Sequence, residues 1–109
     1  MAAFERFLER IHAIVAQHIS DPDFSINMMA EMMHMGHTKL YGKVKELTGM
    51  SPNKLFVEER MRLAAQLLDE GELNISEISY RVGIPDATYF NKCFRQYYGV
   101  SPSKYRKGE

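Results

Sequence analysis

The sequence predicts an all-α fold of about seven helices. Three observations lead to this prediction. Apolar residues recur at intervals of three and four along most of the 109-residue chain, which is the spacing of one helix face. Glycines and Ser-Pro pairs stand at the ends of these periodic stretches, where helices end and begin. No stretch shows the alternation of apolar and polar residues that predicts a half-buried strand.

The first two helices are predicted over residues 4–19 and 26–34. Pro22 ends the first helix, because the residue before a proline is pushed out of the helical region. Ser25 offers a side-chain oxygen as the N-cap of the second. The predicted buried residues are Phe4, Leu8, Ile11 and Val15 in the first helix and Ile26, Met29, Ala30 and Met33 in the second.

A third helix is predicted over residues 37–48 and a longer, fourth helix over residues 52–70. Gly49 stops the third as a left-handed C-cap, and Ser51-Pro52 starts the fourth with an N-cap and a proline at the first helical position. The fourth helix would be a rod of about 28 Å. The predicted packing residues are Leu40, Val44 and Leu47, and then Leu55, Met61, Ala64, Ala65 and Leu68.

Three shorter helices complete the prediction. Asn74 and Glu77 resemble a capping box that opens a helix over residues 75–82. Gly83 marks a tight turn, and Asp86 can cap the next helix. The expected buried side of that helix is Phe90, Phe94 and either Tyr97 or Tyr98. Gly99 ends it, and Ser101-Pro102 opens a last short helix that carries Tyr105.

The charges of the chain sum to zero but are segregated along it. Residues 37–54 carry +3 and residues 86–107 carry +4, which leaves −7 for the rest. A segregated field orients a protein on a polyanion even where the net charge vanishes. The start lacks the pattern of a secretory signal and there is one cysteine, so we expect a reducing, cytoplasmic setting without membrane contact.

The two positive stretches belong to an internal repeat. At an offset of 49 residues, Ile26, Met29, Met33 and Met35 fall on Ile75, Ile78, Val82 and Ile84. Beyond the turn the offset is 50, and there Leu40, Val44, Lys45, Gly49, Ser51, Pro52 and Lys54 meet Phe90, Phe94, Arg95, Gly99, Ser101, Pro102 and Lys104. Each unit is thus a short helix, a tight turn, a longer helix with a polar face, and a Ser-Pro restart.

This arrangement is a helix-turn-helix, whose second helix can enter a DNA major groove about 12 Å wide. The linker rod of about 28 Å would hold the two second helices near the ~34 Å of one duplex turn, with tilted helices or bent DNA closing any shortfall. Because the repeat lies within one chain, the expected DNA site is asymmetric. We predict a first unit over residues 4–50, a linker over 51–71 and a second unit over 72–107.

The stretch ISEISYRVGIPDATYFNKCFRQYYGVSPSKYR is similar to the second helix-turn-helix of AraC-type transcription regulators. The matching features include the Gly83 turn, Tyr89-Phe90, Lys92, Phe94-Arg95 and the Gly-x-Ser-Pro-x-x-Tyr-Arg ending, and the resemblance covers residues 4–107. FLERIHAIVAQHISDPDFSI and LYGKVKELTGMSPNKL further resemble AraC-type domains at the C-terminus of hybrid two-component sensor-regulators. The resemblance implies an output module, monomeric when isolated, that binds promoter DNA, activates transcription and could contact RNA polymerase within a parent protein that could dimerise.

The sequence departs from the family pattern at two positions. His34 stands where the second unit has Gly83, which predicts a looser or differently angled turn in the first unit. Gly42 stands where the family often has a long polar or basic residue, so the first unit is expected to vary in its contacts and the second to anchor.

DNA contacts are predicted from the second helix of each unit. At each named position the alternative is that the residue is simply solvated at the surface. The expected base-facing residues are Thr38, Tyr41, Gly42, Ala87, Thr88, Asn91 and Lys92. The expected phosphate contacts are Lys39, Lys43, Lys45 and Arg95, with His37 at a helix start near the DNA.

Other functions have weaker support. A helical protein-interaction module that has lost DNA binding is the main alternative, favoured by the zero net charge and by Gly42. His34 and His37 lack the further ligands of a metal site, and Cys93 lies between core aromatics without an activating neighbour. The methionines of residues 28–35 are at helical spacing and fit a core. We therefore expect no enzymatic activity, metal or cofactor.

Overall fold

The computed structural model describes residues 3–108 and, over that range, contains seven α-helices and no strand. The helices are α1 (Ala3–His18), α2 (Ile26–Met32), α3 (His37–Thr48), α4 (Pro52–Glu70), α5 (Ile75–Arg81), α6 (Ala87–Tyr98) and α7 (Pro102–Lys107). The predicted all-α fold is confirmed, and the five helices predicted with residue ranges agree with the structure to within two residues at either end.

The predicted caps form because short polar side chains precede the helices. An oxygen of each capping side chain accepts a hydrogen bond from a backbone N–H in the first turn, and the residues are Ser25, Ser51, Asn74, Asp86 and Ser101. The capping box of Asn74 and Glu77 is complete, with both reciprocal hydrogen bonds present. Gly49 and Gly99 end α3 and α6 in the left-handed conformation.

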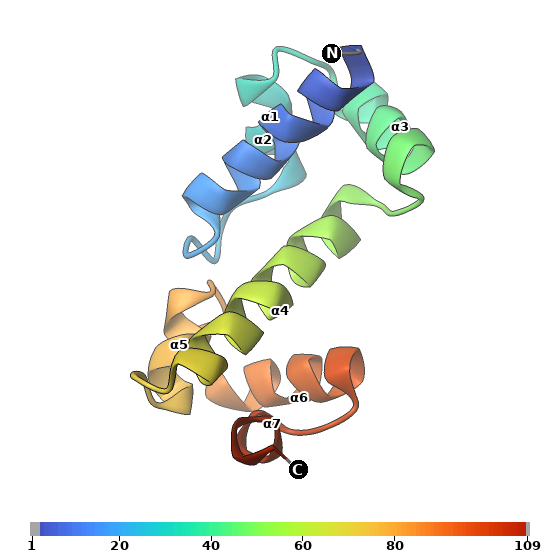
Figure 1. The fold of residues 1–109 in the computed structure, drawn as a ribbon. Helices are drawn as coiled ribbons and strands as arrows, with labels where there is room; N and C mark the ends of the chain where they lie inside the picture. The colour runs from blue at the N-terminus through green and yellow to red at the C-terminus, as the bar shows by residue number, and fades with distance from the viewer. Residues whose placement is uncertain (1–2, 109) are drawn as a thin grey trace.

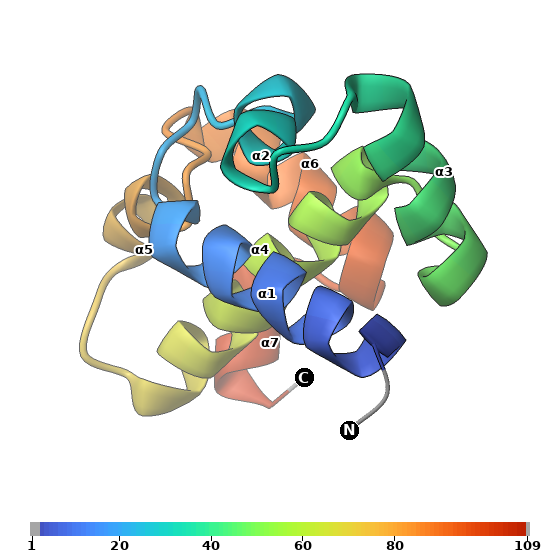
Figure 2. The same cartoon turned by 90° about the horizontal axis from the view of Figure 1, so that it is seen from above.

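The helices form two groups at the two ends of α4 (Figure 1). The first unit, α1–α3, packs around the N-terminal half of α4, and the second unit, α5–α7, packs around its C-terminal half. Seen from above, α1 lies over α4 (Figure 2). The molecule is elongated as a result, with principal extents of 41 × 25 × 21 Å.

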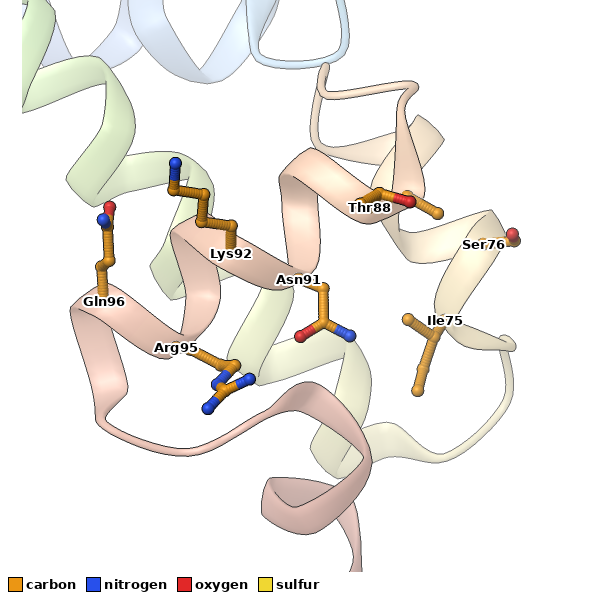
Figure 3. A pocket seen from close by; sticks show the side chains of 8 residues that line it. Ile75, Ser76, Thr88, Asn91, Lys92, Arg95 and Gln96 are labelled. Atoms are coloured by element: carbon orange, nitrogen blue, oxygen red, sulfur yellow. The ribbon is translucent and has the colours of Figure 1, made fainter.

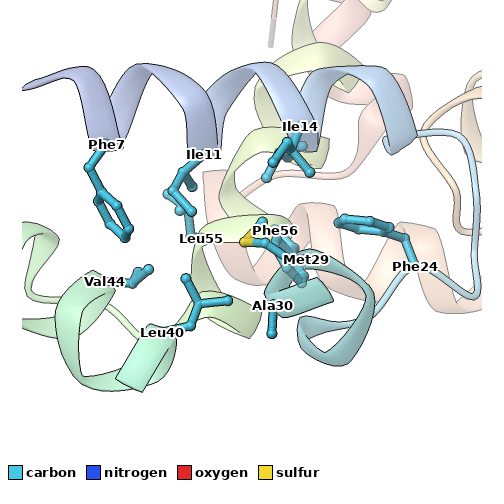
Figure 4. Close-up of a cluster of buried hydrophobic side chains, with 11 residues drawn as sticks. Phe7, Ile11, Ile14, Phe24, Met29, Ala30, Leu40, Val44, Leu55 and Phe56 are labelled. Atoms are coloured by element: carbon cyan, nitrogen blue, oxygen red, sulfur yellow. The ribbon is translucent and has the colours of Figure 1, made fainter. Parts of the chain in front are cut away.

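The first unit has its own apolar core, which α1 closes from one side (Figure 4). Ile11 and Val15 are buried as predicted, but Phe4 is 50% exposed, and Phe7 and Ile14 are buried in its place. Phe4 lies one turn before Phe7, in the first turn of α1. The other core residues of this unit are Phe24, Met29, Ala30, Leu40, Val44, Leu55 and Phe56.

The second unit has a separate core, composed of Met61, Ala64, Ala65, Leu68, Ile78, Val82, Ile84, Phe90 and Phe94. Tyr98 packs against it and its hydroxyl donates to the Met61 carbonyl at 3.3 Å, whereas Tyr97 is 41% exposed. Tyr105 contacts Phe94 edge to face, and Arg106 donates to the Leu73 carbonyl at 2.6 Å. The Tyr-Arg pair of α7 therefore fastens α7 to the core and to the loop after α4.

The turns of the two units have the same hydrogen bonds. In the first, the amide N–H groups of His34 and Met35 donate to the carbonyls of Glu31 and Ala30 at 3.1 and 3.0 Å. In the second, those of Gly83 and Ile84 donate to Tyr80 and Ser79 at the same 3.1 and 3.0 Å. The prediction was of a looser or differently angled first turn. The matching hydrogen bonds show that a looser turn was wrong, while the φ of His34 is 55° against 81° at Gly83. The backbone hydrogen bonds on both sides impose the glycine-like conformation on a histidine.

Candidate nucleic-acid interface

The repeat gives α3 and α6 the same set of outward positions. At the offset of 50 residues the exposed face of α3 carries Thr38, Tyr41, Gly42 and Lys45, and α6 carries Thr88, Asn91, Lys92 and Arg95 at the matching positions. All are exposed except Asn91, which is half-buried. The opposite faces of both helices carry the buried residues Leu40 and Val44, and Phe90 and Phe94. Each helix therefore presents its polar side chains to solvent while its apolar face fixes its orientation.

The second unit brings its predicted contact residues together around one open hollow of about 680 Å³ (Figure 3). Five predicted residues line it: Ala87, Thr88, Asn91, Lys92 and Arg95. Asp86 caps the helix that carries them and keeps the first turn of α6 formed, because its carboxylate accepts from the Tyr89 amide at 3.0 Å. The hollow combines an amide, a hydroxyl and two cationic groups, which are the groups that bind base edges and phosphates.

Three residues that were not predicted as contacts from the sequence line the same hollow. Gln96 lies one residue after Arg95, and Ile75 and Ser76 come from the start of α5 (Figure 3). The repeat contains the signal for Gln96, because the offset of 50 pairs it with Glu46, which is exposed on α3. The α5 residues carry no such signal, because only the packing of α5 on α6 brings them beside α6.

The predicted residues of the first unit are all exposed, and none of them lines the hollow of the second unit. They are His37, Thr38, Lys39, Tyr41, Gly42, Lys43 and Lys45. Lys43 faces the side of α3 rather than its outer surface, since its Nζ lies 4.5 Å from the centroid of the Phe7 ring. Gly42 has open space where a side chain would stand, with no atom within 4 Å of an added Cβ.

A second basic hollow of about 180 Å³ lies beside the first one in the second unit. It is lined by Arg95, Gly99, Val100, Ser101 and Lys104. Lys104 was counted among the positive charges of the sequence but was not assigned a contact. The two hollows share Arg95, so the cationic surface continues from the middle of α6 toward α7.

The structure also describes the groups considered for other functions. Over residues 3–108, no three side chains of His, Cys, Asp and Glu come close enough together to hold a metal ion. Cys93 is half-buried in a groove beside α4, with Tyr89 and Tyr97 among its neighbours. None of the helices in the described part of the chain is long and apolar enough to cross a membrane.

Comparisons with known proteins agree with this geometry. A family model described as a helix-turn-helix domain matches residues 29–108. The chain is 34% identical over 102 residues to histidine kinase P4 of Formosa agariphila, covering 94% of the chain and 7% of that protein. It is 35% identical over 82 residues to the Msm operon regulatory protein of Streptococcus mutans, covering 75% of the chain and 30% of that protein.

A solved structure resembles nearly the whole chain. The C-terminal domain of AraT, a response regulator from Geobacillus stearothermophilus, is 32% identical with a TM-score of 0.88, covering 99% of this chain and 87% of that one. The chain spans most of that solved domain, but it spans less than a third of either curated relative.

Proposed function

Because the chain belongs to the AraC-type family of helix-turn-helix domains, we propose that it is the sequence-specific DNA-binding domain of a transcription regulator. In this proposal α3 and α6 enter successive major grooves of one duplex. The observation that carries the proposal is the exposure of equivalent polar positions on two helices that lie at opposite ends of α4. A length of 41 Å is sufficient for two recognition helices about 34 Å apart.

The second helix-turn-helix supplies the sharpest contacts in this proposal. The Asn91 amide can make a bidentate pair with adenine, and the Lys92 ammonium can donate to guanine. Thr88 and Ala87, at the start of the same helix, would lie against bases as well. Arg95 would contact phosphate, where it fixes the position of the helix without specifying sequence.

The first helix-turn-helix would contact bases through Thr38, Tyr41 and the open surface at Gly42. Lys39 and Lys45 would contact phosphates, with His37 near the DNA at the start of α3. Lys43 would have to leave the Phe7 ring to do so, and we expect it to contribute less than the other two lysines.

The proposed division of the chain is a first unit over residues 4–50, a linker over 51–71 and a second unit over 72–107. Similarity to a small part of a histidine kinase and to a response regulator domain supports an output module of a larger sensor-regulator. The proposed partner is double-stranded promoter DNA in the cytoplasm, with RNA polymerase as a further candidate. Since α3 and α6 belong to one chain, a single copy would occupy an asymmetric site.

The proposal is tested by selecting duplexes from a random pool with the purified domain and measuring affinity for the enriched site at several salt concentrations. We expect one enriched asymmetric sequence and a binding constant that falls with added salt. Replacing Asn91 or Lys92 by alanine should relax the preference at one or two adjacent base pairs, each change costing about 1–3 kcal/mol of discrimination. If no sequence is enriched from the pool and the affinity for DNA does not fall with added salt, DNA recognition is refuted and a protein-docking module is favoured.

A further inference from the structure

The two units do not share an apolar core. In α4, Leu55 and Phe56 belong to the core of the first unit, and Met61 is the first residue in the core of the second. The residues between them, 57–60, belong to neither core. Because the cores are separate, the relative orientation of the units depends on α4 and on the contacts that cross the boundary between the cores.

Arg60 makes such a contact at the boundary between the two cores. Its guanidinium donates from Nη2 to the Asp21 carbonyl at 2.9 Å, in the turn that follows α1. The same guanidinium lies against Gly83, since a Cβ added there would stand 3.2 Å from both Nε and Nη2. One side chain of α4 thus contacts a turn of the first unit and the turn of the second helix-turn-helix.

The two turns also meet each other directly. A Cβ added to Gly83 would come closer than 3.0 Å to the Ile19 carbonyl oxygen, so the backbones are in contact there. Gly83 is buried, and its φ of 81° is one that other residues rarely adopt. The absence of a side chain at residue 83 is what permits the first unit and Arg60 to approach this turn.

The chemistry of Arg60 suits a fixed joint better than a solvated helix surface. Burial lowers the pKa of the Arg60 guanidinium, and the nearby Asp21 carboxylate raises it in opposition. The group remains cationic, because an arginine does not lose its proton in a protein. A planar guanidinium with several donors can donate to the Asp21 carbonyl from one edge while the Gly83 turn packs against another edge.

We propose that Arg60 is a positioning residue that fixes the angle between α3 and α6 and thereby sets the half-site spacing that the domain accepts. The inference rests on the proposed DNA-binding function. The Gly83 turn is bonded to α5 through Ser79 and Ile84, and α6 begins three residues after Ile84. A shift of this turn relative to the first unit is therefore a shift of α6 relative to α3.

The first test compares DNA sites that differ only in spacing. The selected site and versions with one base pair inserted or removed between the half-sites are bound by the wild type, Arg60→Met and Arg62→Met. Arg62 is the control on the same helix: it lines a hollow with Ala16 and Ile19 of the first unit, but its polar partners are Glu58 and Glu59 of α4 itself at 3.0 and 3.8 Å. A spacing change of one base pair moves a half-site by about 3.4 Å along the duplex and rotates it by about 35°.

We expect the wild type and Arg62→Met to discriminate against altered spacing to the same extent. The measured quantity is the dissociation constant for a site of altered spacing divided by that for the selected site. In Arg60→Met this ratio should fall by roughly tenfold, which is the scale of one hydrogen bond from a charged group. Loss of stability alone would weaken binding to all sites and leave this ratio unchanged. Arg60→Lys keeps the charge but not the planar set of donors, so its ratio should lie between those of the wild type and Arg60→Met. This variant also provides the test if Arg60→Met does not fold.

The second test needs no DNA. Spin labels on cysteines at Glu46 of α3 and Gln96 of α6, with Cys93 replaced by serine, report the distance between the helices by double electron–electron resonance. Arg60→Met should broaden or shift the distance distribution, and Arg62→Met should not. An unchanged distribution and an unchanged spacing ratio would overturn the assignment of Arg60. Failure of the wild type to bind any DNA would refute the proposed function, while the spin-label result would still decide whether Arg60 fixes the two units.

Discussion

Gly83→Ala is the substitution for which the structure makes the sharpest quantitative prediction. Gly83 and Gly99 both have a φ of 81°, but only Gly83 has neighbours within 4 Å of an added Cβ. The two alanine variants therefore impose the same backbone strain and differ in the atoms that the new methyl group meets. Gly99→Ala is the matched control.

The magnitude follows from two contributions. An L-residue in the left-handed region costs about 1–2 kcal/mol, and the lower entropy of the unfolded alanine chain returns roughly 0.4–1 kcal/mol. We therefore expect Gly99→Ala to lower the free energy of unfolding by about 1 kcal/mol. At Gly83 the methyl group overlaps the backbone carbonyl of Ile19, which cannot turn away as a side chain can, and overpacking of this kind costs about 1–3 kcal/mol more.

The assay is urea unfolding of the purified domain followed by far-UV circular dichroism, with both variants and the wild type measured together. The midpoints should fall in the order wild type, Gly99→Ala, Gly83→Ala, with the denaturant dependence unchanged. For a domain near this size each kcal/mol corresponds to a melting temperature shift of roughly 4–8 °C. Equal losses in the two variants, within about 0.5 kcal/mol, would refute the close approach of Ile19 to Gly83.

Three further predictions concern the contact surface and its support. Arg95→Ala should weaken binding to all sequences and lower the slope of log affinity against log salt by about 0.9, whereas Arg62→Ala should leave that slope unchanged. Gly42→Ala should raise the free energy of unfolding by about 1 kcal/mol, since the added Cβ meets open space in a helix interior; a loss in urea unfolding would contradict this. Arg106→Met should cost about 1–3 kcal/mol by leaving the Leu73 carbonyl without its donor, and the exposed Lys107→Met should cost nothing measurable in the same assay.

Local sequence signals were sufficient for the helices and the caps. Ser51-Pro52 and the pair Asn74 and Glu77 act within one turn of helix, so neighbours along the chain determine their structure. The exposed face of α6 follows in the same way from the buried spacing of Phe90 and Phe94. Predictions of caps and of helix faces agree with the structure because they depend only on residues close by in the sequence.

The predictions failed at positions where contacts between distant parts of the chain determine burial or backbone conformation. Phe4 and Phe7 both lie on the apolar side of α1, and only the position of the neighbouring helices along α1 determines which one is buried. His34 looked like a departure from the turn of the second unit, but the hydrogen bonds of the surrounding backbone determine its φ. Arg60 has the sequence context of a surface residue, and its partners lie 39 residues before it and 23 residues after it along the chain.

The two turns share their hydrogen bonds and differ by one residue before the second helix, so most of the difference between the two units lies in their side chains. At two matched positions α3 has Gly42 and Glu46 where α6 has Lys92 and Gln96. However, α3 also has Lys39 and Lys43 where α6 has Tyr89 and Cys93, so the two helices carry the same net charge and differ in the groups at their base-facing positions. Because Gly42 has no side chain to contact a base and Lys92 has one, sequence preference should be concentrated in the half-site of α6. In the selected sequences, base preference should be sharper in that half, and replacing Gly42 by lysine should reduce the difference between the halves.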